Sequence, residues 1–179
     1  MHRVNWPMLL TLSRFLMIPL FGWLFTVNIY YAILIVGLAG LTDILDGYLA
    51  RRLAMTSDWG KMLDPLADKL MLLTALFYLG TYNYIALSIF YLVLLKESAM
   101  VAGAGILVSR GKFLGAEWIG KTTTVAFFAA ILLIPLGFKF GYLCLYLAVG
   151  LMIAAFFGYL MKFLRYVGLV SSKDQPKSI

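Results

Sequence analysis

The sequence predicts an all-α integral membrane protein with six transmembrane helices. Hydrophobic residues make up 63% of the 179-residue chain, whereas soluble domains contain about 45–50%. A helix that crosses about 30 Å of hydrocarbon needs about 20 residues, so six spans with short connections fit this length. We therefore expect one membrane domain over residues 1–170 and a polar C-terminal tail over residues 171–179.

The first three expected helices cover residues 8–27, 30–50 and 64–79. The first run is interrupted by Arg14 and has no small-residue cleavage site, which favours a retained helix over a signal peptide. Proline costs little in the first turn of a helix, so we expect Pro65 to lie in the first turn of the third.

The last three expected helices cover residues 84–108, 122–137 and 141–164. The fourth carries an ionisable pair, Lys96-Glu97, midway along its apolar run, and such a pair is unlikely to face lipid. Pro135 lies near the end of the fifth run and is expected to kink or end that helix.

The distribution of basic residues predicts the orientation in the membrane. The connection after the second run, the connection after the fourth run and the C-terminal end are basic, whereas the opposite side carries only Lys139. Because basic loops stay in the cytoplasm, both termini should be cytoplasmic. The net charge of +7 is thus a topology signal that also suits anionic membrane lipids, and we find no nucleic-acid-binding module.

Four aspartates form the most informative pattern, D-x2-D-G-x2-A-R-x8-G-x3-D-x3-D, which begins at Asp43. The spacing places Asp43 and Asp46 on one face of their helix, and Asp64 and Asp68 on one face of the next. Each carboxylate at mid-membrane costs about 2.5–3.5 kcal/mol, so a compensating cation is expected. Oxygen ligands favour Mg²⁺, Mn²⁺ or Ca²⁺ over zinc.

The alternative interpretation of these aspartates is structural. They would then be helix caps or ion-pair partners of nearby basic residues, namely Arg51, Arg52, Lys61 and Lys69.

With this pattern the sequence resembles the CDP-alcohol phosphatidyltransferase family. The family signature matches at Asp43, Asp46, Gly47, Ala50, Arg51, Gly60, Asp64 and Asp68. The resemblance implies about six transmembrane helices, an active site on the cytoplasmic face of a bacterial plasma membrane, Mg²⁺ or Mn²⁺ as cofactor, and a homodimer.

The resemblance also implies roles for individual residues. The four aspartates would hold the metal at the pyrophosphate of the CDP-lipid, with Asp68 also acting as the general base that activates the acceptor alcohol. The CDP-lipid would be bordered by Gly47, Ala50, Arg51 and Gly60.

Three further segments resemble the branches of the family that make phosphatidylglycerophosphate and cardiolipin. They are the stretch that ends at Arg14, the pair Lys96-Glu97, and the element that begins Gly120-Lys121. An acceptor such as glycerol 3-phosphate brings its own phosphate, which requires basic residues. The candidates for binding it are Arg14, Lys96, Arg110, Lys112 and Lys121.

These candidates also have simpler interpretations. Arg14 could extend to the lipid headgroups, Arg110 and Lys112 could only determine topology, and Lys121 could pair with Glu117 at i,i+4.

The leading functional hypothesis is transfer of a phosphatidyl group from CDP-diacylglycerol to glycerol 3-phosphate, which yields phosphatidylglycerophosphate and CMP. The close alternative is cardiolipin synthesis with phosphatidylglycerol as acceptor. Two alternatives belong to other functional classes. The protein could be a cation transporter, or an inactive homologue that acts as an assembly partner. Transporters tend to place their sites at the midplane of repeated halves, whereas these aspartates cluster in two adjacent spans.

Overall fold

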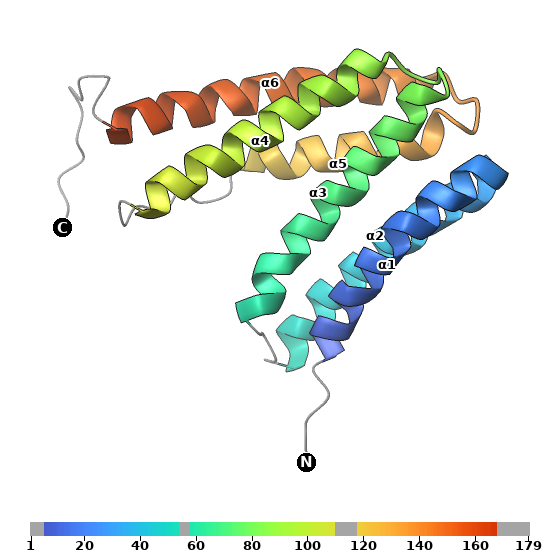
Figure 1. Cartoon of the computed structure of the whole chain (residues 1–179), viewed down its shortest axis with the longest axis horizontal. Helices are drawn as coiled ribbons and strands as arrows, with labels where there is room; N and C mark the ends of the chain where they lie inside the picture. Colours follow the sequence, from blue (N-terminus) through green and yellow to red (C-terminus); the bar gives the residue numbers. More distant parts are fainter. Residues whose placement is uncertain (1–5, 54–57, 110–117, 168–179) are drawn as a thin grey trace.

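A computed structural model describes residues 6–53, 58–109 and 118–167, and within these ranges the chain forms six α-helices (Figure 1). The expected tail 171–179 lies outside the described residues. The helices are α1 (Trp6–Val27), α2 (Ile29–Leu53), α3 (Asp58–Thr81), α4 (Leu87–Ser109), α5 (Trp118–Leu133) and α6 (Phe140–Val167). The all-α class predicted from composition is confirmed.

The bounds of the third helix correct one expectation. Helix α3 begins at Asp58, so Pro65 lies inside the helix and not in its first turn. Proline has no N–H to donate to the carbonyl four residues earlier, so α3 lacks one bond of its ladder at that point. The expected helix began at residue 64, where the apolar run begins, and so missed the polar first turns that start at Asp58.

Helix α5 ends at Leu133, just before Pro135, as the proline predicted. The amide of Phe138 donates to the carbonyl of Leu133 at 3.1 Å. Gly137 adopts a positive φ of 82° within this turn, a conformation that glycine adopts without a steric penalty. The turn returns the chain into α6, which packs along α5.

Three of the helix connections gather at one side of the molecule, and the opposite helix ends lie away from them (Figure 1). The α1–α2, α3–α4 and α5–α6 connections lie at the right of the view. The start of α1 and the facing ends of α2 and α3 lie at the bottom, and the end of α4 and the end of α6 lie at the left. This alternation is the one expected for successive spans.

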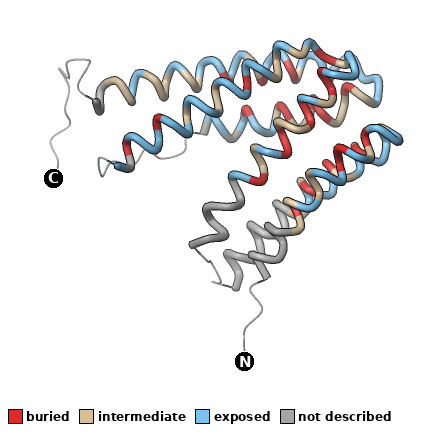
Figure 2. Tube along the Cα trace, in the orientation of Figure 1, coloured by how far each residue is buried: buried red, intermediate tan, exposed pale blue. Residues whose placement is uncertain are grey.

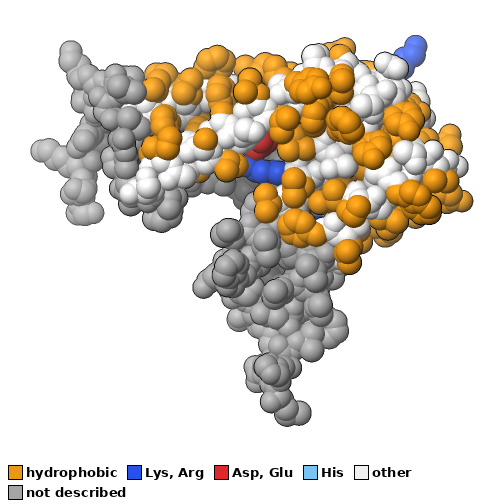
Figure 3. Space-filling view, in the orientation of Figure 1, with side chains coloured by type: hydrophobic (Ala, Val, Ile, Leu, Met, Phe, Trp, Pro, Cys, Tyr) orange, Lys and Arg blue, Asp and Glu red, His pale blue; other side chains and the backbone are white. Residues whose placement is uncertain are grey.

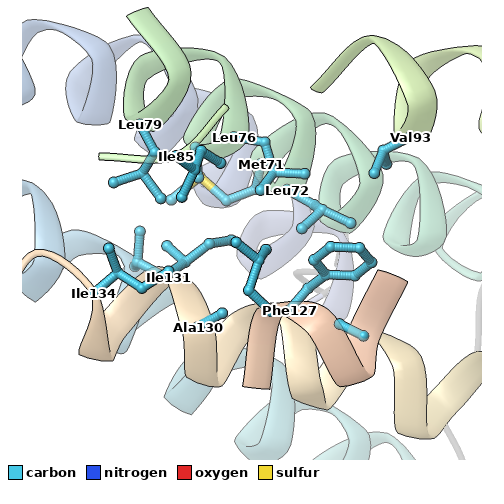
Figure 4. Packing of buried hydrophobic residues seen from close by; sticks show 14 of the residues in the cluster. Met71, Leu72, Leu76, Leu79, Ile85, Val93, Phe127, Ala130, Ile131 and Ile134 are labelled. Atoms are coloured by element: carbon cyan, nitrogen blue, oxygen red, sulfur yellow. The ribbon is translucent and has the colours of Figure 1, made fainter. Parts of the chain in front are cut away.

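Helix α3 is the centre of the fold, because it packs against α1, α4 and α5. Its buried residues Met71, Leu72, Leu76 and Leu79 face α5 across the core, where Phe127 packs (Figure 4). Against α1 the approach is close, since a Cβ at Gly22 would lie 2.7 Å from the hydroxyl of Tyr78.

Exposed residues lie along every described helix (Figure 2), and many of them are large and hydrophobic, such as Leu16, Leu95 and Tyr146. Among the described residues, two stretches are long and apolar enough to cross a membrane, Leu87–Leu107 and Phe140–Leu164. Shorter apolar helical stretches are Ser13–Val27, Ile29–Thr42 and Thr122–Leu133. Crossing by all six helices stays a prediction.

Candidate active site

An ion pair joins α1 to α3 at the predicted site. Arg14 Nη1 donates to Asp68 Oδ1 at 3.0 Å. Only 4% of the Arg14 side chain is exposed, whereas 34% of Asp68 remains accessible. The guanidinium is therefore fixed inside the helix bundle, and it orients a carboxylate that can still be reached. Extension of Arg14 to the headgroups, the simpler interpretation, does not fit this burial.

Arg14 and Asp68 line a cavity of about 600 Å³ between α1, α2, α3 and α5. The remainder of its wall is largely apolar and includes Met71, Phe128 and Leu132. A cavity of this size lies within the range of about 300–1,000 Å³ usual for small-molecule sites. The cavity therefore combines one charged pair with walls that are otherwise largely apolar.

The wall that α2 contributes includes three small residues, Gly37, Ala39 and Gly40. Gly37 and Gly40 line the cavity, and a Cβ added at either would meet no atom within 4 Å. Two other lining residues, Leu41 on α2 and Val125 on α5, are 58% and 70% exposed. The cavity wall therefore includes two apolar side chains that are also accessible from outside the helix bundle.

The other predicted aspartates lie on the two helices that carry this wall. Asp43 follows Gly40 by three residues on α2, and Asp64 precedes Asp68 by four on α3. Residues three or four apart share a helix face, so Asp43 and Asp64 stand one turn beyond two residues that line the same cavity. Helix α2 ends at Leu53 and α3 begins at Asp58, which keeps these two helix ends close together.

For most of the signature the structure describes the helical backbone and not the side chains. This holds for Asp43, Asp46, Gly47, Ala50 and Arg51 on α2 and for Gly60 and Asp64 on α3. Their predicted contacts with metal and nucleotide stay predictions.

The basic candidates separate into three groups. Arg14 lines the cavity, and Lys121 stands one turn before Thr124, which lines it too. Lys96 is not part of the cavity wall. Arg110 and Lys112 lie outside the described residues.

A second charged cluster links α3 to α4. Lys69 Nζ lies 2.6 Å from Glu97 Oε2, and Lys96 Nζ lies 2.6 Å from Glu97 Oε1. Figure 3 shows oppositely charged side chains together at the inner corner of the molecule, where the described surface is otherwise mainly hydrophobic. The sequence pattern suggested Lys69 only as an ion-pair partner of the four signature aspartates, and not as a partner of Glu97. The ionisable pair within the apolar run of α4 was the signal that a charged neighbour was needed.

Comparison with known proteins shows which sequences this chain resembles. A sequence model of the CDP-alcohol phosphatidyltransferase family matches residues 4–160. A CDP-diacylglycerol–glycerol-3-phosphate 3-phosphatidyltransferase of Pseudomonas fluorescens is 33% identical over 179 residues, covering 88% of this chain and 89% of the relative.

Two shorter matches include one protein with the same name and one with a different name. A protein of Blochmanniella floridana that bears the same name as the Pseudomonas relative is 44% identical over 85 residues, or 45% of each chain. A cardiolipin synthase (CMP-forming) of Streptomyces coelicolor is 34% identical over 112 residues, covering 59% of this chain and 52% of the relative.

Proposed function

Because the chain belongs to the CDP-alcohol phosphatidyltransferase family, we propose that it transfers the phosphatidyl group of CDP-diacylglycerol to glycerol 3-phosphate, releasing phosphatidylglycerophosphate and CMP. The observation that carries this proposal is the cavity that Asp68 and Arg14 share. It combines a polar reaction point with an apolar enclosure, as an amphiphilic lipid substrate requires.

The exposed apolar residues of the cavity wall support a lipid donor in particular. A diacylglycerol moiety can enter from the bilayer between Leu41 and Val125, which are both exposed and both part of the wall. The open space beside Gly37 and Gly40 gives room for acyl chains along α2. The headgroup would then lie toward the ends of α2 and α3 that carry the other aspartates.

The reaction needs a base, a positioned nucleophile and neutralised phosphate charge. Asp68 accepts the proton of the acceptor hydroxyl, and the oxygen attacks the phosphorus that bears diacylglycerol. The new P–O bond forms as the bond to the CMP oxygen breaks, so CMP leaves. Arg14 holds one oxygen of the Asp68 carboxylate and thereby fixes its direction.

The donor set fits a hard divalent cation. Asp43, Asp46 and Asp64 would hold Mg²⁺ or Mn²⁺ together with Asp68, because carboxylate oxygens suit these ions. When bound, the ion supplies positive charge that stabilises the phosphates and the leaving group. On this proposal Gly47, Ala50, Arg51 and Gly60 border the CDP moiety.

Glycerol 3-phosphate is favoured over phosphatidylglycerol for two reasons. The Pseudomonas relative, matched over 88% of this chain, carries that acceptor in its name, and Arg14 supplies a buried cation in the cavity wall. Cardiolipin synthesis remains the second candidate because of the Streptomyces relative.

The test is CMP release by purified protein in liposomes that contain CDP-diacylglycerol and Mg²⁺ or Mn²⁺. Glycerol 3-phosphate, phosphatidylglycerol, inositol 1-phosphate and serine are supplied in turn, with Asp68→Asn as the control. We expect release with glycerol 3-phosphate, and loss of about 10²–10⁴-fold of the rate in the control. Release with phosphatidylglycerol alone would assign cardiolipin synthesis, and release with none would reject the proposal.

The proposal includes a cytoplasmic active site and a homodimer. The first rests on the basic residues near the ends of α2, α4 and α6, and the second on family resemblance. Mass measurement in detergent would test the dimer.

A further inference from the structure

We propose that Lys69 and Glu97 are positioning residues, whose ion pair sets the rotation of α3 and so aims the carboxylate of Asp68 into the cavity. This inference rests on the proposed role of Asp68 as the base. It assigns a function to the charged cluster that lies outside the cavity wall.

The first step is the adjacency of Asp68 and Lys69. Neighbouring residues on an α-helix project about 100° apart. Asp68 is held by Arg14 of α1 at 3.0 Å, while Lys69 is held by Glu97 of α4 at 2.6 Å. Two consecutive side chains of α3 thus contact charged groups of two different helices, and both contacts oppose rotation of α3.

The second step is the setting of Glu97. Its side chain is only 12% exposed, although it lies within an apolar stretch of α4 long enough to span a membrane. A buried carboxylate at such a position is costly unless it is paired. Lys96 already pairs with it at 2.6 Å, so charge neutralisation does not require Lys69. The pair with Lys69 adds the link to α3.

The third step is the geometry of the reaction. Side-chain atoms lie about 5–6 Å from a helix axis, so a rotation of about 10° moves the Asp68 carboxylate by about 1 Å. A displacement of about 1 Å can lower a catalytic rate about 100-fold. The packing of α3 against α5 is apolar, and apolar contacts carry little directional preference. The two ion pairs therefore add a directional constraint to the one that close side-chain packing supplies.

The main test uses Lys69→Met, which leaves Glu97 paired with Lys96, and its matched control Lys139→Met at an exposed lysine in the α5–α6 connection. We expect kcat to fall about 10- to 100-fold in Lys69→Met, with KM for CDP-diacylglycerol and for the acceptor changed less than about threefold. Lys69→Arg should restore most of kcat because it keeps the cation. A rise of the acceptor KM in Lys69→Met would overturn the inference, since it would make Lys69 a substrate ligand.

The second test is a double-mutant cycle with Glu97→Gln. If both residues act through one contact, the double variant should lose no more kcat than the more impaired single variant. Losses that multiply, or wild-type kcat in Lys69→Met, would overturn the inference.

The cycle is measured with whichever acceptor releases CMP, so a failure of the glycerol 3-phosphate assignment is seen separately in the wild type. The same cycle on the thermal unfolding midpoint needs no activity. Additive effects on that midpoint would also overturn the inference, because they would mean that the two side chains do not interact.

Discussion

The Nη1 atom of Arg14 lies 3.0 Å from Oδ1 of Asp68, although 54 residues separate them in the chain. This contact places a cation of the first helix against the last aspartate of the signature, inside a cavity of about 600 Å³. Arg14 can therefore act in two ways, by orienting Asp68 and by attracting the acceptor phosphate.

Replacement of Arg14 separates these two actions. We expect Arg14→Lys to raise the KM for glycerol 3-phosphate about tenfold or more, because lysine keeps the charge but loses the forked geometry that binds phosphate and carboxylate together. Arg14→Met, which removes the charge as well, should lower kcat/KM for glycerol 3-phosphate below the value of Arg14→Lys. Initial-rate kinetics with varied glycerol 3-phosphate measure this, and an unchanged KM in both variants would restrict Arg14 to orienting Asp68.

A larger side chain at Gly40 should obstruct the lipid and not the fold. A Cβ at this position meets no atom within 4 Å, and leucine favours a helix over glycine by roughly 1 kcal/mol or less. We expect Gly40→Leu to keep its unfolding midpoint and to raise the KM for long-chain CDP-diacylglycerol more than for a short-chain analogue.

Gly105→Leu is the matched control for Gly40→Leu. Gly105 is an exposed glycine of α4 that also has open space around it, and it does not line the cavity. Equal effects of the two substitutions would argue against acyl chains beside α2.

Removal of divalent metal should stop the reaction. Treatment with EDTA is expected to abolish CMP release, and added Mg²⁺ or Mn²⁺ should restore it. The reason is that the proposed metal ligands are all carboxylates, which bind these two ions well. Direct binding can be followed by Mn²⁺ electron paramagnetic resonance. Asp64→Asn should then weaken Mn²⁺ binding, and full activity in EDTA would contradict the metal assignment.

The orientation can be tested with single cysteines in a Cys144→Ser background. Lys139→Cys, in the α5–α6 connection, should react with an impermeant maleimide added outside intact cells. Ser109→Cys, at the end of α4, should react only after the membrane is opened. The reverse pattern would place the proposed active site on the outer face.

Much of this structure was predictable because apolar runs and helix signals are local. Six runs gave six helices, and Pro135 marked the end of α5 within two residues. The early start of α3 was missed because its first turns are polar, and hydrophobic periodicity does not detect such turns. At the site, the spacing of the aspartates and the family resemblance indicated Asp68, whereas the contacts Arg14–Asp68 and Lys69–Glu97 depend on how separate helices pack.

The long sequence separation between Arg14 and Asp68 has a consequence for biogenesis. At a synthesis rate of about 5–20 residues per second, Arg14 is made roughly 3–11 s before the carboxylate that it will bind. During that interval the first helical hairpin reaches the insertion machinery with an arginine whose final partner does not yet exist. Because a charged side chain at mid-membrane costs about 2.5–3.5 kcal/mol, we expect the hairpin to be held more stably in the membrane once α3 has been made and Asp68 contacts Arg14.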